Sequence, residues 1–311
     1  MNTNNNIINK AALTTGNVTA GLLNPEQSRR FIKQTMENTV LGGLIRTEMR
    51  KAKTGEIDKI GIGRRLVRKK TEDTDDGNRN KPIFSKVEYS AVAVRLPWEI
   101  TEETLRENIE GQGLEATITS LMAQAVGIDM EDLWLNADTA VPAEDPDVDF
   151  LKVNDGWIKQ LLAGSHVIDR ATVNGGALTL DVWNDALLEM PNKYNNGKLR
   201  WLMSPHRKQA WETYLLDKAI TAGGIISDRR IENPYAIPAV AVPSMPDDMV
   251  ILTDPKNLIV VNTYDVKIRK TTEGKEAIMQ DKRFYVIHLD FDPIIEEMDA
   301  AVIVKGLADI V

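Results

Sequence analysis

The sequence predicts an α+β fold in which a basic N-terminal arm and a long hairpin are joined to an acidic body. Helical and strand-like periods alternate along the chain without an internal repeat. Residues 1–70 carry 14 Lys and Arg against 5 Asp and Glu, a net charge of +9, whereas residues 71–311 carry 24 against 41, a net charge of −17. A basic segment of this kind can bind nucleic acid or dock onto the acidic body of a neighbouring copy.

The composition of the 311 residues argues against several classes of protein. Apolar residues make up 42% of the chain, which allows a real core and argues against wholesale disorder. No stretch approaches the roughly 18 continuous apolar residues that cross a bilayer, and residues 1–6 lack the features of a secretory signal. The absence of cysteine excludes disulfides, thiolate nucleophiles and cysteine zinc sites, and it suits assembly in a reducing cytoplasm.

The first 50 residues are predicted to form an arm that ends in a short helix. Residues 1–24 are rich in Asn and Thr and show no period, so this part needs a partner to become ordered. Pro25 is well placed for the first turn of a helix, and Ile32, Met36 and Val40 then recur at four-residue spacing. Another subunit is a natural candidate for the partner.

A long two-stranded hairpin is predicted over residues 51–96. An apolar run over residues 57–67 and an alternating run over residues 83–96 flank a polar tip, and we expect Pro97 to end the second strand. Because an isolated hairpin is marginal in water, it is expected to lie against a partner surface. Its first strand carries a basic cluster formed by Arg64, Arg65, Arg68, Lys69 and Lys70.

The remaining sequence predicts helices followed by a mixed region. Thr101 is expected to cap a short helix, and a long amphipathic helix runs from Leu114 toward Trp134. Beyond a connector at residues 141–150, helices and strands alternate, and strands predominate from residue 237 onward. The six tryptophans lie mostly among apolar neighbours and are expected in the core.

Two motifs suggest ligand binding but fail on spacing. Gly61 begins a glycine pair that lacks the third glycine of a dinucleotide loop, because that position is Leu66. Asp145, Asp147 and Asp149 begin like a calcium loop but lack its glycine and its final glutamate. We therefore expect no cofactor.

His288, Asp290 and Asp292 alternate on one predicted strand and so share a face, where they could hold a divalent metal. The alternative is that their apolar neighbours face the core while these three residues face water or another subunit. Because such alternation is common in strands, this alternative is favoured over a metal site by roughly five to one. Ser204 is explained as a helix cap, and no sequence resembles a nucleophile elbow. We expect no catalytic residue and no metal site, so the chain is not expected to be an enzyme.

Several stretches, taken in order, resemble the major capsid proteins of tailed bacteriophages that share the Hong Kong 97 fold. The similarity runs from about residue 25 to the end, and the order of the parts is more specific than any one motif. Residues 125–132 resemble the end of the spine helix of that family, and residues 199–205 resemble the strand and helix that begin its axial domain. Its later strands resemble residues 237–240, 244–246, 251–254 and 299–304.

The resemblance implies a Hong Kong 97-like fold divided into five parts. These are an N-arm at residues 1–50, an E-loop hairpin at 51–96, a peripheral domain with the spine helix at 97–150, an axial domain at 151–282 and peripheral return strands at 283–311.

The resemblance also implies the function, namely self-assembly into hexamers and pentamers of an icosahedral head that encloses double-stranded DNA without sequence-specific binding. Implied partners are further copies of the chain, a separate scaffolding protein, a portal and possible decoration proteins, with no membrane. The location would be the virion after assembly in the host cytoplasm. As a hypothesis, the basic cluster of one copy meets an acidic set on its neighbour, formed by Glu102, Glu103 and Glu107.

Three other functions remain open at this point. An encapsulin-like bacterial compartment shares the fold and would enclose protein cargo in place of DNA. A nucleic-acid-binding protein would use the basic segment and show salt-sensitive affinity. A metal-dependent hydrolase built on His288, Asp290 and Asp292 would lose activity on chelation.

Overall fold

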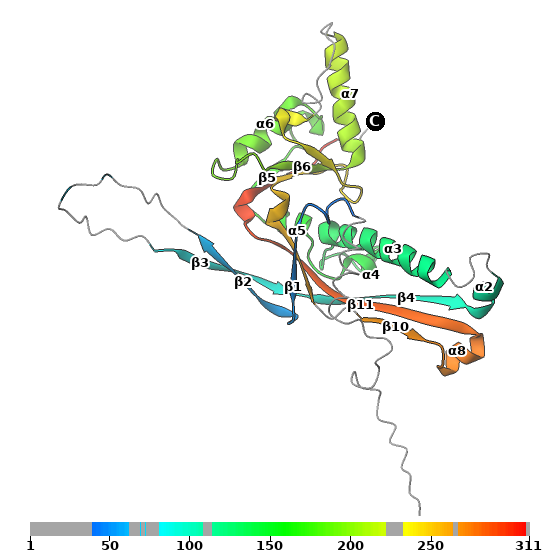
Figure 1. Cartoon of the computed structure of the whole chain (residues 1–311). Coiled ribbons are helices and arrows are strands. Elements are labelled where there is room, and N and C mark those ends of the chain that lie inside the picture. The colour runs from blue at the N-terminus through cyan, green and yellow to red at the C-terminus, as the bar shows by residue number, and fades with distance from the viewer. Residues whose placement is uncertain are drawn as a thin grey trace, which may run out of the picture.

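The computed structural model describes residues 39–61, 69, 72, 81–107, 114–221, 233–263 and 267–308. The predicted arm before Thr39, including the helix expected around Ile32 and Met36, lies outside the described residues, as does most of the hairpin tip. Within the described part, a two-stranded ribbon projects from a body made of two sheets (Figure 1). The predicted α+β class is confirmed.

The first sheet is formed by β1 (Arg46–Arg50), β4 (Val92–Thr101), β9 (Leu258–Thr263), β10 (Lys267–Thr271) and β11 (Lys282–Ile295). The second sheet is formed by β5 (Val167–Asp169), β6 (Arg200–Met203), β7 (Ala239–Ala241), β8 (Val250–Thr253) and β12 (Ala301–Lys305). The ribbon pairs β2 (Thr54–Gly61) with β3 (Ile83–Ser90). Strand β11 leads into β12, so the last strands of the chain connect the two sheets.

The helices lie on these sheets and between them (Figure 1). They are α2 (Glu102–Glu107), α3 (Leu114–Asn136), α4 (Val148–Leu151), α5 (Trp157–Leu162), α6 (Leu180–Glu189), α7 (Pro205–Thr221) and α8 (Lys275–Gln280). Short 3-10 turns occur at η2 (Asn174–Gly176), η3 (Pro234–Ala236), η4 (Pro255–Asn257) and η5 (Met298–Ala300). Among the described residues, no helix is both long and apolar enough to cross a membrane.

Two apolar clusters form the core. The larger one joins α3 and α5 to residues of both sheets, and the other joins α6 and α7 to the second sheet. In the second cluster, Trp183 packs edge-on against Trp201 and Trp211, with ring centroids 4.8 and 5.3 Å away. All six tryptophans are buried, which confirms the prediction that they belong to the core.

The predicted second hairpin strand is in fact two strands with different partners. Strand β3 pairs with β2, whereas β4 pairs with β11 in the body. Pro97 does not end β4, which continues to Thr101. Among the described strands β4 pairs with β11 alone, so it is an edge strand, where a proline without an N–H group is tolerated. The prediction that Pro97 ends the strand was therefore wrong.

The helices predicted after this strand are present. The Thr104 backbone N–H donates to the Thr101 hydroxyl, 3.3 Å away, so Thr101 caps α2 as expected. Helix α3 spans 23 residues and includes Trp134, as predicted, but it is not amphipathic as expected, because Leu121 and Ile128 are exposed and its apolar residues are not confined to one face. The Arg207 backbone N–H donates to the Ser204 hydroxyl at 3.0 Å, which confirms Ser204 as the cap of α7.

Candidate assembly interface

The β2–β3 ribbon is attached to the body by a small apolar cluster. Ile57 and Tyr89 from its two strands are buried against Ile259, Val261 and Ile294 of the first sheet. Farther out the ribbon loses this cover. Ile60 and Phe84, which lie opposite each other in the ladder, are 72% and 68% exposed. The ribbon is therefore anchored at its base and presents apolar surface beyond it.

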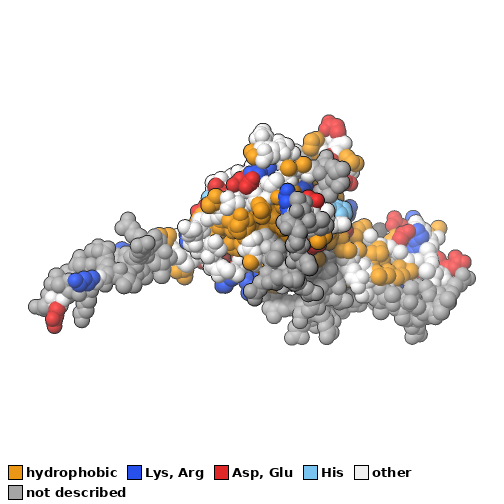
Figure 2. Space-filling view, turned by 90° about the horizontal axis from the view of Figure 1, so that it is seen from above, with side chains coloured by type: hydrophobic (Ala, Val, Ile, Leu, Met, Phe, Trp, Pro, Cys, Tyr) orange, Lys and Arg blue, Asp and Glu red, His pale blue; other side chains and the backbone are white. Residues whose placement is uncertain are grey.

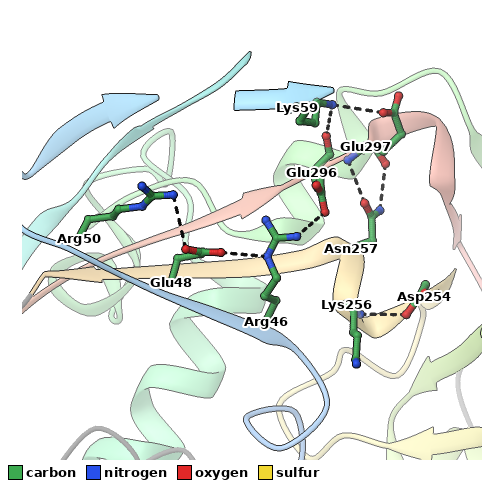
Figure 3. A network of polar contacts seen from close by, with 9 residues as sticks. All are labelled: Arg46, Glu48, Arg50, Lys59, Asp254, Lys256, Asn257, Glu296 and Glu297. Atoms are coloured by element: carbon green, nitrogen blue, oxygen red, sulfur yellow. Dashed lines mark hydrogen bonds and ion pairs between the residues drawn. The ribbon is translucent and has the colours of Figure 1, made fainter. Parts of the chain in front are cut away.

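Polar contacts also hold the base of the ribbon (Figure 3). The Lys59 amine donates to the backbone carbonyl of Glu296 and forms an ion pair with Glu297 at 3.2 Å. Arg46 of β1 forms an ion pair with Glu296 at 2.7 Å. The turn between β11 and β12 thus binds both the ribbon and the first strand.

Asn257 fixes the same turn from the other side. Its side-chain amide donates to the Glu297 carbonyl at 2.9 Å, and its side-chain oxygen accepts from the Glu297 N–H at 2.9 Å (Figure 3). These paired bonds satisfy both backbone groups of Glu297. Four segments that are distant in sequence are therefore connected where the ribbon leaves the body.

The polar residues of β11 also contribute to this anchor. Asp290 accepts a hydrogen bond from Thr263 and forms an ion pair with Lys53, both at 3.1 Å. Asp292 accepts from the backbone N–H of Ser90 at 2.7 Å. The expectation that these carboxylates face water or a neighbour was wrong, because the base of the ribbon covers them. Burial raises the pKa of Asp292 from its ordinary value of 3.8 to about 6.

The metal hypothesis for this strand receives no support from the described residues. No group of three or more His, Asp or Glu side chains among them is arranged to hold a metal ion. The two carboxylates instead bind Lys53, Thr263 and Ser90. The two carboxylates thus connect segments of the chain to one another.

The residues of the charge-pairing hypothesis are only partly described. Arg64, Arg65, Arg68 and Lys70 lie outside the described residues, and Lys69 is exposed. Glu102 is bound by Arg283 of its own chain, with one nitrogen–oxygen distance of 3.0 Å. Of the other two acidic residues, Glu103 is exposed, and nothing is described of the Glu107 side chain. Pairing between copies stays a prediction.

Glu131 is a buried anchoring residue that the sequence patterns did not indicate. It lies on α3, is 3% exposed, and accepts a hydrogen bond from the Leu41 N–H at 3.0 Å. Burial raises the pKa of Glu131, opposed by the bonds from Leu41, Val40 and Thr39. No local signal singles it out, because Asp129 and Asp132 flank Glu131 in the same helix. Glu131 fixes the point where the arm meets the body.

A second exposed apolar surface lies away from the ribbon. Figure 2 shows apolar side chains gathered on the face seen from above. On α6, Leu180 and Leu188 are exposed, the latter by 76%. Apolar surface of this kind often marks a contact with another protein.

Comparisons with known proteins agree with this geometry. No protein-family model matches the sequence. The chain is 28% identical to the putative prophage capsid protein YqbE of Bacillus subtilis, in an alignment of 321 residues that covers 97% of this chain and 98% of that protein.

Solved structures give the same result at the level of fold. The satellite phage P4 procapsid with its size determination protein has a TM-score of 0.67 at 18% identity, covering 92% of both chains. Microbacterium phage Oxtober96 has a TM-score of 0.57 at 14% identity, covering 86% of this chain and 90% of that chain. The SrpI encapsulin of Synechococcus elongatus has a TM-score of 0.52 at 12% identity, covering 86% of both chains.

The chain therefore has the Hong Kong 97-like fold, and the resemblance found in the sequence is confirmed. A relative in sequence is named as a putative prophage capsid protein. Together these findings support a major capsid shell function, with encapsulin as a minor structural neighbour. They also support homo-oligomeric shell formation, suggest a non-enzymatic role and point to the virion capsid.

Proposed function

We propose that this chain is a major capsid protein that self-assembles into hexamers and pentamers of an icosahedral phage head enclosing double-stranded DNA. The observation that carries the proposal is the projecting ribbon, whose outer apolar residues Ile60 and Phe84 have little cover within the chain. Exposure of these two apolar side chains to water is unfavourable, and their burial against a neighbouring subunit would remove that cost. The homology with a prophage capsid protein supports the same conclusion.

The shape of the chain suits a ring of identical subunits. A ribbon that projects from one side and docks on another part of the next copy makes a heterologous contact, which rotational symmetry closes into a ring. Within such a ring, the basic cluster would approach acidic groups of the neighbour. Because Glu102 is already bound by Arg283, Glu103 and Glu107 are the better candidates for this pairing.

We also propose the five-part division by chain order, with the arm at 1–50, the E-loop at 51–96, the peripheral domain at 97–150 and 283–311, and the axial domain at 151–282. Strands from different parts of this division lie together in each of the two sheets. Strands β9 and β10 lie in the sheet of β4 and β11, whereas β12 lies in the other sheet. The turn held by Asn257 and Lys59 would then connect the two domains.

The partners follow from the same proposal. A separate scaffolding protein and a portal would act during assembly in the host cytoplasm, and decoration proteins could be added later. The acidic body suits a container for DNA, because strong attraction of the inner wall to phosphates would oppose packing and ejection.

An encapsulin-like compartment is the second candidate, favoured by the structural likeness to SrpI. Nuclease treatment of particles purified from phage-producing cells separates the two. A capsid protein should protect double-stranded DNA of uniform length inside the shell. Particles that hold a defined protein cargo and no protected DNA would favour the compartment and contradict the phage assignment.

A further inference from the structure

An open cleft lies between the long helix α3 and strand β4 (Figure 1). It has a volume of about 410 Å³, and α4 forms another of its walls. The walls are mostly apolar and include Leu96 of β4, Met130 of α3 and Phe150 of α4. Because Leu96 and Phe150 are only partly buried, the described residues leave part of this apolar surface uncovered.

The cleft borders the edge of β4 as well as one of its faces. Four successive residues of the strand line it, namely Ala93, Val94, Arg95 and Leu96. Alternate residues of a strand point to opposite faces, so a cavity lined by consecutive residues extends around the strand edge. Among the described strands, β4 pairs with β11 alone, so no described strand covers this edge.

The direction of the backbone groups on this edge follows from the ladder. The Glu102 N–H donates to the Asp281 carbonyl at 2.9 Å, in register with the pairing of β4 and β11. Because bonded pairs alternate along an antiparallel ladder, even-numbered residues of β4 point their N–H groups toward β11 and odd-numbered residues point them outward. Pro97 has no N–H group and occupies an outward position. The N–H and C=O groups of Ala93 and Arg95 therefore point to the open edge beside the cleft.

The same edge is covered by a strand on the other side of Ala91. The Ala91 N–H donates outward to the Lys53 carbonyl at 2.7 Å, and the pairing of β2 with β3 continues from there. Beyond this point the edge has no described partner strand, and the cleft lies beside the stretch before Pro97. An added strand is thus the kind of structure that already covers the neighbouring part of this edge.

The rim of the cleft is acidic. Asp129 of α3 and Asp149 of α4 are exposed, and Arg95 is the one basic residue among the described residues that line the cleft. Burial, and then the nearby charge of Asp132, raise the pKa of Asp129. A positive group placed beside these carboxylates would therefore be favourable.

The ribbon of a second copy does not match this charge. Cross-strand pairing and alternation place Ile60 and Phe84 on one face of the ribbon together with Lys86. The same face carries three acidic residues, which are Glu56, Asp58 and Glu88. These carboxylates would be repelled by the acidic rim, so a segment of a different protein fits the cleft better.

We propose that the cleft between α3 and the edge of β4 binds an extended segment of a different protein, which adds a strand to β4 at Ala93 and Arg95. Apolar side chains at alternate positions of the segment fill the cleft, and a lysine or arginine lies beside Asp129 and Asp149. In this mode of recognition the backbone bonds give affinity and the side-chain contacts give selectivity. Pro97 ends the added strand because it lacks an outward N–H group.

Binding of a short synthetic peptide to the unassembled full-length subunit tests this proposal. The peptide alternates valine with threonine and has a lysine at each end, and fluorescence anisotropy measures its binding. We expect saturable binding with a Kd below about 1 mM. Ala93→Pro removes an outward N–H group and should weaken binding at least about fivefold, whereas the control Ala93→Val keeps this group and should bind normally.

Two N-methylated forms of the peptide test strand addition without any change in the protein. One form is methylated at the valine nitrogens and the other at the threonine nitrogens. Because alternate N–H groups of a strand point to opposite sides, methylation should block binding in one form and be tolerated in the other. Equal affinities of the two forms would contradict the addition of a strand.

The charge of the rim is tested with a peptide that carries glutamate in place of the terminal lysines. This peptide should bind about twofold to fivefold more weakly than the original one. The combined variant Asp129→Asn and Asp149→Asn should remove most of the difference between the two peptides. The same difference in this variant would show that the two carboxylates do not attract the segment.

Two further outcomes would overturn the proposal. One is the absence of saturable peptide binding to the unaltered subunit. The other is self-association of the subunit that Ala93→Pro abolishes, which would assign the edge to a second copy. Size-exclusion chromatography measures self-association, circular dichroism measures folding of each variant, and electron microscopy reports shell formation separately. Failure of this proposal is thus distinguishable from failure of the capsid proposal.

Discussion

Asp292 shows how a single carboxyl group connects the ribbon to the body. It accepts from the Ser90 N–H at the base of β3, yet its surroundings disfavour the charge and raise its pKa to about 6. A carboxyl whose folded pKa exceeds its unfolded value binds more protons in the folded state between these two values. Stability from this group is therefore present at low pH and is lost as the pH rises through about 6.

The variant Asp292→Asn should remove this pH dependence. Asn keeps an oxygen that can accept from Ser90 and carries no charge at any pH. We expect its unfolding free energy at pH 7 to exceed that of the unaltered chain by about 1–2 kcal/mol, with the difference vanishing near pH 4. Urea unfolding at several pH values measures it, with the exposed Glu144→Gln as control. A constant difference across pH would contradict the expectation.

Glu131 has a corresponding structural role at the root of the arm. Glu131→Ala leaves the Leu41 N–H without its partner and should cost about 1–3 kcal/mol of unfolding free energy. Glu131→Gln retains an acceptor and should cost clearly less. Hydrogen exchange at the Leu41 amide should be faster in the Ala variant than in the Gln variant. Equal exchange in both variants would show that the carboxyl does not hold this turn.

The ribbon is the element on which assembly is predicted to depend. Reversing the charge at Arg64, Arg65 and Arg68 should reduce shell yield while the subunit still folds. The matched control reverses three exposed lysines, Lys152, Lys198 and Lys256. Size-exclusion chromatography and circular dichroism measure assembly and folding separately. Normal shells in the variant would make the charge-pairing hypothesis wrong.

The exposed apolar pair on the ribbon gives a second prediction for the same element. Replacing Ile60 and Phe84 by Ser should change the thermal stability of the subunit little, because both side chains are largely exposed. The same change should weaken assembly, because the apolar area would no longer be buried between copies. Leu188→Ser, also largely exposed, is the control. Unchanged assembly would exclude Ile60 and Phe84 from the contact.

The sequence predicted the kinds of elements better than their partners. Alternation over residues 83–96 correctly indicated β structure, but it could not show that the strand changes partner at Ala91. There the Ala91 N–H donates to the Lys53 carbonyl, 2.7 Å away. Local periodicity reports which face of a strand is apolar, whereas the choice of partner is decided by tertiary packing. For the same reason Pro97 could be tolerated in β4.

The sequence predicted the fold better than it predicted the contacts of the candidate site. Glu131, Asn257 and Asp292 act through partners that are 40 to 202 residues away in the chain. No local pattern contains such pairings. The order of the segments, by contrast, is a property of the entire chain, and it was sufficient to indicate the Hong Kong 97-like fold that the structural matches confirm.

The described part of the chain combines a two-sheet body with a ribbon whose outer apolar surface this body leaves exposed (Figure 1). The charge is also unevenly distributed along the sequence, because residues 1–70 are basic and the remainder is acidic. Like-charged bodies repel each other, so basic extensions that lie on acidic neighbours would lower the cost of bringing many copies together. We therefore expect assembly to become weaker as salt is raised.

Negative-stain electron microscopy of the purified chain, with its scaffolding protein co-expressed and size-exclusion chromatography in parallel, tests most directly whether this protein builds a shell. We expect uniform closed shells, with rings of five or six subunits or tubes where closure is incomplete. A stable monomer or dimer at every salt and protein concentration tested would contradict a capsid function.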